Sequence, residues 1–402
     1  MDFKENAWIA VLAVLLIGGV AFFAVSDALK AGTNGNPLPP ASPSSSAGGN
    51  PSASGSPATP NSNSASGAPA AGSGSSSNIA LKELQYPRAP SWSSYQGVIN
   101  GPRGDTFSSE DLKGKVALVD FWTYSCINCL RTIPYVEAWE QRYGPQGLLI
   151  VDIHAPEFDF EKNRGNVEMA VKRLNLTTIN VLDGEHRIWS AFGNQHWPHM
   201  YLIHADGFIR YDHIGEGSYD QTESQIRALL EEQNKSMNMT SASPISVSGA
   251  NTVDFTQVGS PELYFGGSSR RAPLGNSPPV GVPGAALSYT PPSSMEANRI
   301  YLNGSWADDG EDMRLASETG DILITYHAKA VHLVADSMDN KSSVQVFLDG
   351  QPYSGPEAGS SGSIAIGPSR LYTMVLTSGY ETHTARIHIT GSGLRAYSFT
   401  FG

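Results

Sequence analysis

The sequence predicts an α/β domain followed by an all-β, jelly-roll-like sandwich, with an apolar segment and a low-complexity linker before them. Strand and helix periodicities alternate through the middle of the chain, whereas short β-rich segments separated by Gly and Pro fill the last third. The first 78 residues contain neither pattern. The predicted parts are 1–30 (transmembrane anchor or signal), 31–78 (disordered linker), 79–235 (α/β domain), 236–254 (linker) and 255–402 (β-sandwich).

The N-terminal 30 residues contain an uncharged apolar run from Ala7 to Val25. These 19 residues would form a helix about 28 Å long, which matches the hydrocarbon core of one bilayer. Ala24-Val-Ser26 is an acceptable cleavage site, so a removed signal peptide is the alternative to an anchor. We expect a single-pass anchor in the cell membrane, with the soluble domains on the extracytoplasmic side.

Residues 31–78 consist almost entirely of Ala, Gly, Ser, Pro, Asn and Thr, and include no charged or aromatic side chain. Such a segment cannot bury a hydrophobic core, and we expect it to be disordered. As a flexible coil, it would separate its ends by about 40 Å on average. It fits either a tether for a catalytic domain or a passive spacer.

The chain is acidic, with 26 Lys and Arg against 38 Asp and Glu and a formal net charge of −12. A strongly negative chain repels phosphate backbones and anionic lipid surfaces. This composition argues against nucleic acid or an anionic membrane surface as the main partner.

The α/β domain is predicted from alternating apolar strands and amphipathic helices. A buried strand spans 116–121, and the segment after it is patterned as a helix. The elements expected after that strand are a helix at 127–143, a strand at 147–153, a helix at 163–174, strands at 179–182, 200–204 and 208–213, and a helix at 219–233.

Cys126 and Cys129, the only two cysteines, lie between the strand at 116–121 and the start of the next helix. The unpaired N–H groups and positive dipole end of a helix start favour a thiolate there. The pair therefore indicates a dithiol–disulfide redox site, with no cofactor besides the redox-active pair and no metal. The alternatives are a zinc site completed by His196 and His199, and a structural disulfide, which would close only a two-residue loop.

The residues around the cysteines resemble the active-site segment of thioredoxins. Asp120-Phe-Trp122, three further residues and Cys126-x-x-Cys129, with Pro134 five residues on, follow that family's pattern. The resemblance implies that Asp120 is buried beneath Cys129 and accepts its proton, and that Trp122 shields the site. It also implies a thioredoxin-like fold for the α/β domain.

A second match lies downstream, where Phe192-Gly-Asn-Gln-His-Trp-Pro198 resembles the cis-proline loop of thioredoxins. The resemblance implies that a cis Pro198 faces the dithiol, bars metal from the sulfurs and leaves the backbone of Trp197 free to pair with a substrate. Glu157 matches the position of an acidic residue near the dithiol of TlpA/ResA-like reductases, which implies a second proton-handling group.

Four motifs together resemble the extracytoplasmic part of DipZ-type proteins, which are close to the membrane-anchored thiol reductases of the TlpA/ResA group. The motifs are 122–129, 154–158, 191–198 and 213–217. DipZ proteins usually carry a multi-helix, electron-transferring membrane domain before this part, and this sequence does not. We therefore expect a separate membrane thiol donor to supply the electrons.

The predicted sandwich contains short strands at 299–302, 321–327, 331–335, 344–348, 371–376, 383–389 and 394–401, with a long loop at 267–294. Residues 260–266 and 394–402 resemble the C-terminal domain of DipZ-type proteins, which is similar to carbohydrate-binding jelly rolls. The aromatic residues that could form a sugar platform are Tyr301, Trp306 and Tyr353, although core or rim positions are the more ordinary roles for them.

Two functions follow from these features. The first is an extracytoplasmic thiol–disulfide oxidoreductase: Cys126 attacks a disulfide of an exported protein or apocytochrome, and Cys129 resolves the mixed disulfide. Cys-Ile-Asn-Cys carries no histidine or positive charge between its cysteines, which favours a reductase. The second is a surface module whose sandwich binds a glycan or a protein, with the thioredoxin-like domain as a scaffold.

Overall fold

The computed structural model describes residues 81–94, 96–235, 243–247, 253–276 and 284–402. The chain divides into two compact units, residues 1–85 and 86–402, and the fold below is that of the second. The apolar run at 7–25 and the linker at 31–78 lie outside the described residues. Within the described ranges, no helix combines the length and the apolar character that a membrane span needs.

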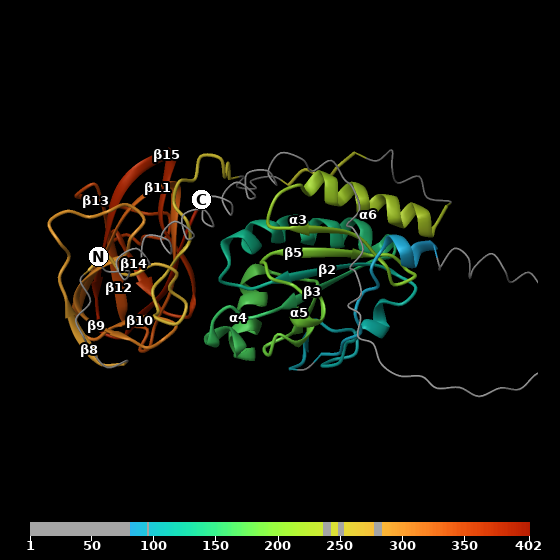
Figure 1. The fold of residues 1–402 in the computed structure, drawn as a ribbon, viewed down its shortest axis with the longest axis horizontal. Helices are drawn as coiled ribbons and strands as arrows, with labels where there is room; N and C mark the ends of the chain where they lie inside the picture. The colour runs from blue at the N-terminus through green and yellow to red at the C-terminus, as the bar shows by residue number, and fades with distance from the viewer. Residues whose placement is uncertain (1–80, 95, 236–242, 248–252, 277–283) are drawn as a thin grey trace, which may run out of the picture. The chain divides into compact units, whose positions relative to one another are not determined.

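The α/β domain is built on a six-stranded mixed sheet, of which β2, β3 and β5 are labelled in Figure 1. The strand order is β1-β4-β3-β2-β5-β6. The central strands β2, β3 and β4 are parallel, and the flanking pairs are antiparallel. The strands are β1 (Val98–Ile99), β2 (Val116–Trp122), β3 (Leu148–His154), β4 (Ile179–Leu182), β5 (His199–Ile203) and β6 (Ile209–Ile214).

Helices cover both faces of this sheet (Figure 1). Leu118 of β2 and Ile150 of β3 belong to one buried cluster with side chains of α3 and α6. Their neighbours in the strands, Val119 and Val151, point to the opposite face and a second cluster, as strand alternation requires. The helices are α3 (Ile127–Tyr143), α4 (Arg164–Leu174), α5 (Arg187–Ala191) and α6 (Tyr219–Gln233), with 3-10 turns η1 (Ser109–Leu112), η2 (Gly144–Gln146) and η3 (Asp159–Lys162).

The β-rich domain, residues 260–402, is antiparallel in all its described strand pairings. Its long strands β11 and β15 pair with each other, and β11 also pairs with β9 at one end and β16 at the other. The strands are β7 (Leu263–Tyr264), β8 (Ala286–Tyr289), β9 (Tyr301–Asp308), β10 (Met313–Leu315), β11 (Thr319–Ser337), β12 (Ser342–Leu348), β13 (Gln351–Tyr353), β14 (Ser363–Ile366), β15 (Arg370–Thr390) and β16 (Leu394–Phe401).

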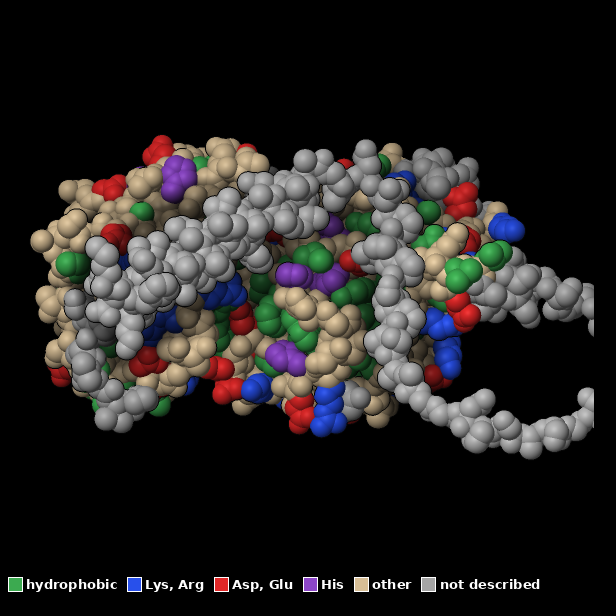
Figure 2. Space-filling view, in the orientation of Figure 1, with side chains coloured by type: hydrophobic (Ala, Val, Ile, Leu, Met, Phe, Trp, Pro, Cys, Tyr) green, Lys and Arg blue, Asp and Glu red, His purple; other side chains and the backbone are tan. Residues whose placement is uncertain are grey.

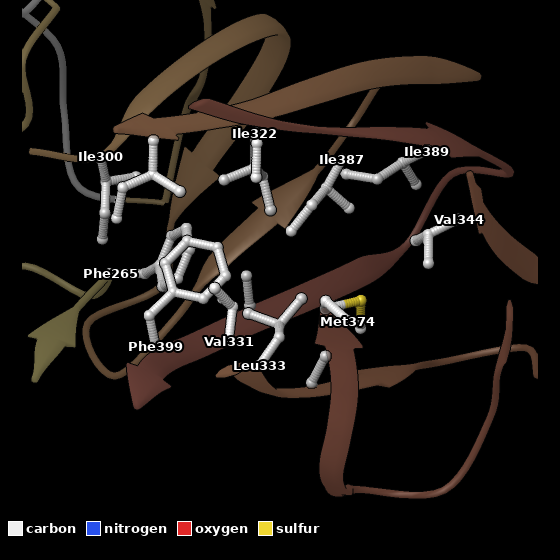
Figure 3. Packing of buried hydrophobic residues seen from close by; sticks show 14 of the residues in the cluster. Phe265, Ile300, Ile322, Val331, Leu333, Val344, Met374, Ile387, Ile389 and Phe399 are labelled. Carbon is white, nitrogen blue, oxygen red and sulfur yellow. The ribbon is translucent and has the colours of Figure 1, made fainter. Parts of the chain in front are cut away.

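The core of the β-rich domain is a continuous cluster of aliphatic and aromatic side chains (Figure 3). The ring centroids of Phe265 and Phe399 lie 5.1 Å apart, and Ile322 and Ile387 are fully buried in the same cluster. Alternate residues of β11 and β15 supply much of this cluster, because antiparallel strands present every second side chain to one face.

Several predicted elements are confirmed, and three predictions need correction. The helices at 127–143 and 219–233 and the strand at 179–182 have the predicted bounds. The segments 321–327 and 331–335 are one strand, β11, and 371–376 and 383–389 are one strand, β15, because the two strands stay paired through two bulges. The predicted loop at 267–294 contains the strand β8.

Asp349 and Gly350 form the turn between β12 and β13. Asp349 has φ 51° and Gly350 has φ 80°, and together they join the strands as a two-residue hairpin. Positive φ at both positions is the geometry that favours Asp-Gly in such turns.

Candidate active site

The two cysteines lie at the start of helix α3, which follows strand β2. Cys126 is the N-cap residue of α3 and is partly buried, whereas Cys129, one turn into the helix, is 1% exposed. Neither sulfur is bonded to the other in this structure. Cys126 is therefore the more accessible of the two thiols, and the loop before Pro198 lies against it.

Asp120 lies inside the fold on the side of the sheet that faces α3. It is 4% exposed, and its carboxyl oxygen Oδ1 has no hydrogen-bond partner. Burial raises the pKa of Asp120, and the charge of Asp152 on the neighbouring strand raises it further. The pKa of Cys129 is also raised, first by burial, then by its hydrogen bond with Cys126 and by the charges of Cys126 and Asp120. Asp120 thus faces the helix that carries Cys129, and its charge acts on the Cys129 thiol.

The proline loop closes over Cys126. The Trp197–Pro198 peptide bond is cis, and the Trp197 carbonyl oxygen lies 4.0 Å from the Cys126 sulfur. The indole N–H of Trp197 donates to the Ala155 carbonyl at 3.0 Å, and Asn194 accepts from two backbone N–H groups of the loop. The expected cis proline beside the dithiol is confirmed.

Glu161 anchors the loops on both sides of the dithiol, and sequence reasoning missed it. It is 1% exposed, and its Oε1 accepts from the backbone N–H and the hydroxyl of Ser125, the residue before Cys126. Its Oε2 accepts from the backbone N–H groups of Glu157 and Phe158. One buried carboxylate thus ties the Cys126 loop to the loop after β3. Glu157, Asp159 and Glu161 occupy alternate positions in this segment, and no local sequence signal distinguishes Glu161 from the other two.

Trp122 lies inside the fold beside the dithiol, in a cluster that includes Tyr124, Cys129 and, at its edge, Cys126. Its ring meets His154 edge-on at 5.3 Å, and Tyr124 stacks on His154 at 5.6 Å. Burial lowers the pKa of His154 to about 3, so this imidazole stays neutral at physiological pH. The cluster keeps water away from Cys129, which agrees with the shielding expected of Trp122.

Glu157 lies at the contact between the α/β domain and the β-rich domain. The Tyr264 hydroxyl of β7 is 2.5 Å from a Glu157 carboxyl oxygen and 2.8 Å from a carboxyl oxygen of Glu262. Burial, followed by the charge of Glu262, raises the pKa of Glu157 to about 8, whereas the hydrogen bond that the Tyr264 hydroxyl donates to Glu157 lowers it.

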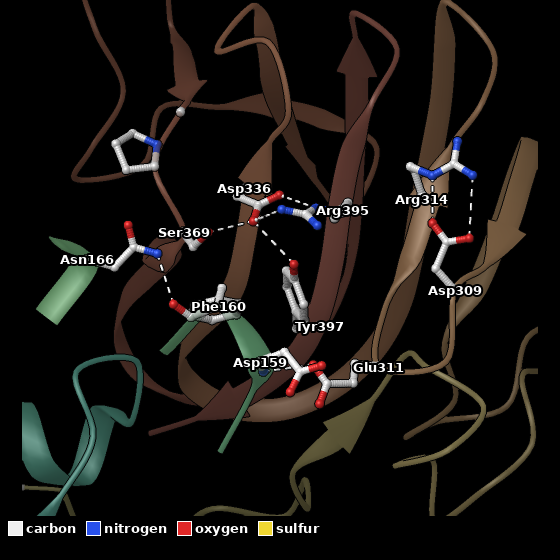
Figure 4. A network of polar contacts seen from close by, with 12 residues as sticks. Asp159, Phe160, Asn166, Asp309, Glu311, Arg314, Asp336, Ser369, Arg395 and Tyr397 are labelled. Carbon is white, nitrogen blue, oxygen red and sulfur yellow. Dashed lines mark hydrogen bonds and ion pairs between the residues drawn. The ribbon is translucent and has the colours of Figure 1, made fainter. Parts of the chain in front are cut away.

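The β-rich domain also packs beside the dithiol through apolar contacts. Ile127, the residue after Cys126, shares a buried cluster with Phe158 of the α/β domain and Tyr397 of the β-rich domain. The Tyr397 ring meets Phe160 edge-on at 4.7 Å, and its hydroxyl donates to Asp336 (Figure 4). A pocket of about 310 Å³ beside Trp197 is lined by residues of both domains, including Glu157, Tyr264 and Arg271.

Replacing Tyr264 with Phe should raise the pKa of Glu157 above about 8, because the Tyr264 hydrogen bond lowers that pKa and the variant removes it. At pH 8 less than half of Glu157 should then be ionised. An NMR titration of labelled glutamate carboxyl carbons would follow this group. Tyr289→Phe, in the same domain but away from Glu157, is the matched control, and an unchanged Glu157 titration in Tyr264→Phe would contradict the assignment.

The histidines do not complete a zinc site with the cysteines. His199 directs Nδ1 to Asn194 and Nε2 to Asp212, and His196 is exposed on the loop. Within the part of the chain that the structure describes, no group of three or more His, Cys, Asp or Glu side chains is arranged to hold a metal ion.

The candidate sugar platform is not exposed. Trp306 is 0% and Tyr301 2% exposed, and both belong to the interior of the β-rich domain. Tyr353 is partly buried, and its hydroxyl donates to the Leu376 carbonyl at 2.7 Å. On the face drawn in Figure 2, acidic and basic side chains lie next to one another. Lys162–Asp159 and Arg164–Glu168 are two such ion pairs of the α/β domain.

Two families match the chain, one for each folded domain. Residues 90–230 match the family described as redoxin, and residues 260–402 match the family described as thioredoxin like C-terminal domain. The DipZ protein of Mycobacterium bovis is 32% identical over 316 residues, which cover 78% of this chain and 43% of that protein. The chain is a homologue of the DipZ proteins. It spans less than half the length of these curated relatives.

Shorter relatives match the α/β domain alone. The thiol-disulfide oxidoreductase YkuV of Bacillus subtilis is 24% identical over 129 residues, covering 32% of this chain and 86% of that protein. The thiol-disulfide oxidoreductase ResA of Bacillus thuringiensis is 26% identical over 132 residues, covering 33% of this chain and 73% of that protein. The α/β domain is therefore homologous to thioredoxin-like thiol–disulfide oxidoreductases.

Proposed function

We propose that this chain is a membrane-tethered, extracytoplasmic thiol–disulfide oxidoreductase that reduces disulfides of exported proteins or apocytochromes. One observation carries the proposal. The Cys126 sulfur lies at the start of a helix, 4.0 Å from the carbonyl oxygen that precedes cis Pro198, while Cys129 is buried one turn into that helix and Asp120 is buried on the sheet face toward it. An accessible thiol, a shielded second thiol and a buried base are what a two-step exchange needs.

The reaction transfers two electrons from the dithiol to the substrate. The Cys126 thiolate attacks one sulfur of the substrate disulfide, so that a mixed disulfide forms and a substrate thiolate leaves. Cys129 then loses its proton to Asp120 and attacks the Cys126 sulfur, which releases the second substrate thiolate. The protein is left with a Cys126–Cys129 disulfide and the substrate with two thiols.

Turnover requires that the Cys126–Cys129 disulfide be reduced again. Outside the cytoplasm this role falls to a separate membrane thiol donor, because no soluble reductant pool is maintained there. The apolar run at 7–25 and the charge-free segment at 31–78 support tethering on the extracytoplasmic side.

A glycan or protein ligand of the β-rich domain is the alternative function. The burial of Trp306 and Tyr301 removes two of its three candidate contact residues. The pocket lined by Glu157, Trp197 and Arg271 instead supports a role for the β-rich domain beside the dithiol, where it would contact a polypeptide substrate.

Trapping with Cys129→Ser in the full-length chain tests the proposal. This variant keeps the attacking thiol and lacks the resolving one, so substrates should stay attached to Cys126 as mixed disulfides. Mass spectrometry of the adducts, released by a reductant, would identify them. Cys126→Ser is the matched control and should trap nothing. Recovery of no Cys126-linked protein, together with no reduction of insulin by the unmodified chain, would overturn the redox function.

A further inference from the structure

Asp152 is a second buried carboxyl group next to the proton acceptor of the dithiol. It lies on β3 as the direct Cα partner of Asp120 on β2, and each residue is 4% exposed. Partner residues of adjacent strands, about 4.8 Å apart, point to the same face of a sheet. Leu118 and Ile150, two positions before each aspartate, face α3, so both aspartates also face the helix that carries Cys129.

Both aspartates have an oxygen without a partner. The Oδ1 atom of Asp120 and the Oδ1 atom of Asp152 are buried and accept no hydrogen bond, while Oδ2 of Asp152 accepts from the Thr178 hydroxyl. Two carboxylates at this separation cannot both be ionised inside a fold without a counter-charge, and they are expected to share one proton. Burial raises the pKa of Asp152 to about 7, in the range where that proton is exchangeable.

The other acidic groups that act on Asp152 lie on helix α3. Helix α3 contributes Glu140, whose Oε2 is buried without a partner, and Glu137, whose carboxylate accepts from the exposed Thr177. The charges of both glutamates raise the pKa of Asp152. Strand β4 contributes only the neutral Asn180, the Cα partner of Asp152, and β5 contributes Met200, the Cα partner of Asp120.

We propose that Asp152 shares a proton with Asp120 and relays the proton that Cys129 releases, through Glu140 and Glu137, to solvent. This inference rests on the proposed function, because it concerns the resolving step of the same dithiol. Asp152 acts through Asp120 and does not touch the reacting sulfurs.

The relay balances the chemistry of the resolving step. Cys129 gives its proton to the Asp120–Asp152 pair, and the Cys129 sulfur forms a bond to the Cys126 sulfur. The bond between Cys126 and the substrate sulfur breaks, and the substrate leaves as a thiolate that takes a proton from water. The proton held by the aspartate pair moves along the glutamates to solvent, which restores the base for the next cycle.

Stopped-flow reaction of the reduced full-length chain with the aromatic disulfide dithiobis(nitrobenzoate) separates the two steps. The first release of thionitrobenzoate reports attack by Cys126, and the second reports resolution by Cys129. In Asp152→Asn the second release should slow by about tenfold or more at pH 7, and its pH profile should lose one ionisation, while the first release stays unchanged.

Three further variants test whether a slower second release is specific to the proposed relay. Asp120→Asn combined with Asp152→Asn should be no slower than Asp120→Asn alone, because the two residues act as one unit. Glu140→Gln should slow the second release in the same direction, and provides an independent test if Asp152→Asn folds poorly. Glu168→Gln, an exposed change on α4, should alter neither release.

The outcomes distinguish the inference from the proposed function. If the unmodified chain shows both releases, but Asp152→Asn and Glu140→Gln leave the pH profile of the second unchanged, the relay is wrong and the oxidoreductase function stands. If the unmodified chain shows no release dependent on Cys126, the proposed function itself fails.

Discussion

Replacing Glu161 with Ala should lower the free energy of unfolding by about 3–5 kcal/mol, because it removes the acceptor of four hydrogen bonds from a buried site. The backbone N–H groups of Ser125 and Phe158 would be left inside the fold without partners. Unpaired buried donors are among the few causes of losses this large. Urea denaturation followed by tryptophan fluorescence would measure the change.

The same replacement should also slow disulfide reduction, since Ser125 directly precedes Cys126 and would lose its anchor. Glu161→Gln retains one acceptor oxygen and should give a smaller loss of stability. Glu168→Gln is the control for removing an exposed acid, and should stay within about 0.5 kcal/mol of the unmodified chain. A stability of Glu161→Ala equal to that of Glu168→Gln would show that the Glu161 contacts do not hold the loops.

Replacing Asp152 with Asn should stabilise the protein above neutral pH, by about 4 kcal/mol at pH 8. The folded pKa of Asp152 is raised to about 7, whereas its ordinary value is 3.8. Between these two values the folded chain binds more protons than the unfolded chain, so stability falls as the pH rises through this window. One pKa unit corresponds to about 1.4 kcal/mol. Asparagine cannot ionise, so the variant does not lose stability in this way as the pH rises. Its side-chain oxygen can still accept the hydrogen bond from the Thr178 hydroxyl.

Urea denaturation at pH 4 and pH 8 would measure both stabilities. Near pH 4 the two proteins should differ little, because the folded Asp152 is neutral there. Asp159→Asn, an exposed acid paired with Lys162, is the matched control and should show no gain at pH 8. If Asp152→Asn is no more stable than the unmodified chain at either pH 4 or pH 8, then Asp152 ionises in the native protein without a loss of stability.

Part of the site was predictable because its residues belong to short sequence patterns. Cys126 and Cys129 follow an apolar strand with two residues between them, and that local pattern already places one thiol at a helix start and one inside it. Asp120 and Pro198 followed from the resemblance to thioredoxins, and the structure buries the first and gives the second a cis bond. Asp152 had a comparable signal, an acid in an otherwise apolar strand, which the sequence reasoning did not use.

Other parts could not be predicted because they depend on contacts across long stretches of sequence. Glu161 meets Ser125 from 36 residues away, and Tyr264 meets Glu157 from 107 residues away. No local sequence pattern predicts contacts between residues so far apart in the chain. The long strands β11 and β15 were also divided wrongly, since Gly379 and the residues around Lys329 look like turns until their pairing partners are known.

The order of the elements, the cysteine pair and the β-rich character of the C-terminal domain are predictable from the sequence alone, because strand and helix periods and cysteine spacing are local properties. Only the tertiary structure decided which acids surround the dithiol. Asp152 joins Asp120 through the register of two parallel strands, and Glu157 acquires its high pKa from burial and from the charge of Glu262 in the other domain. Burial and charge act through space, so the proton chemistry of this dithiol is set by packing and not by neighbours in the chain.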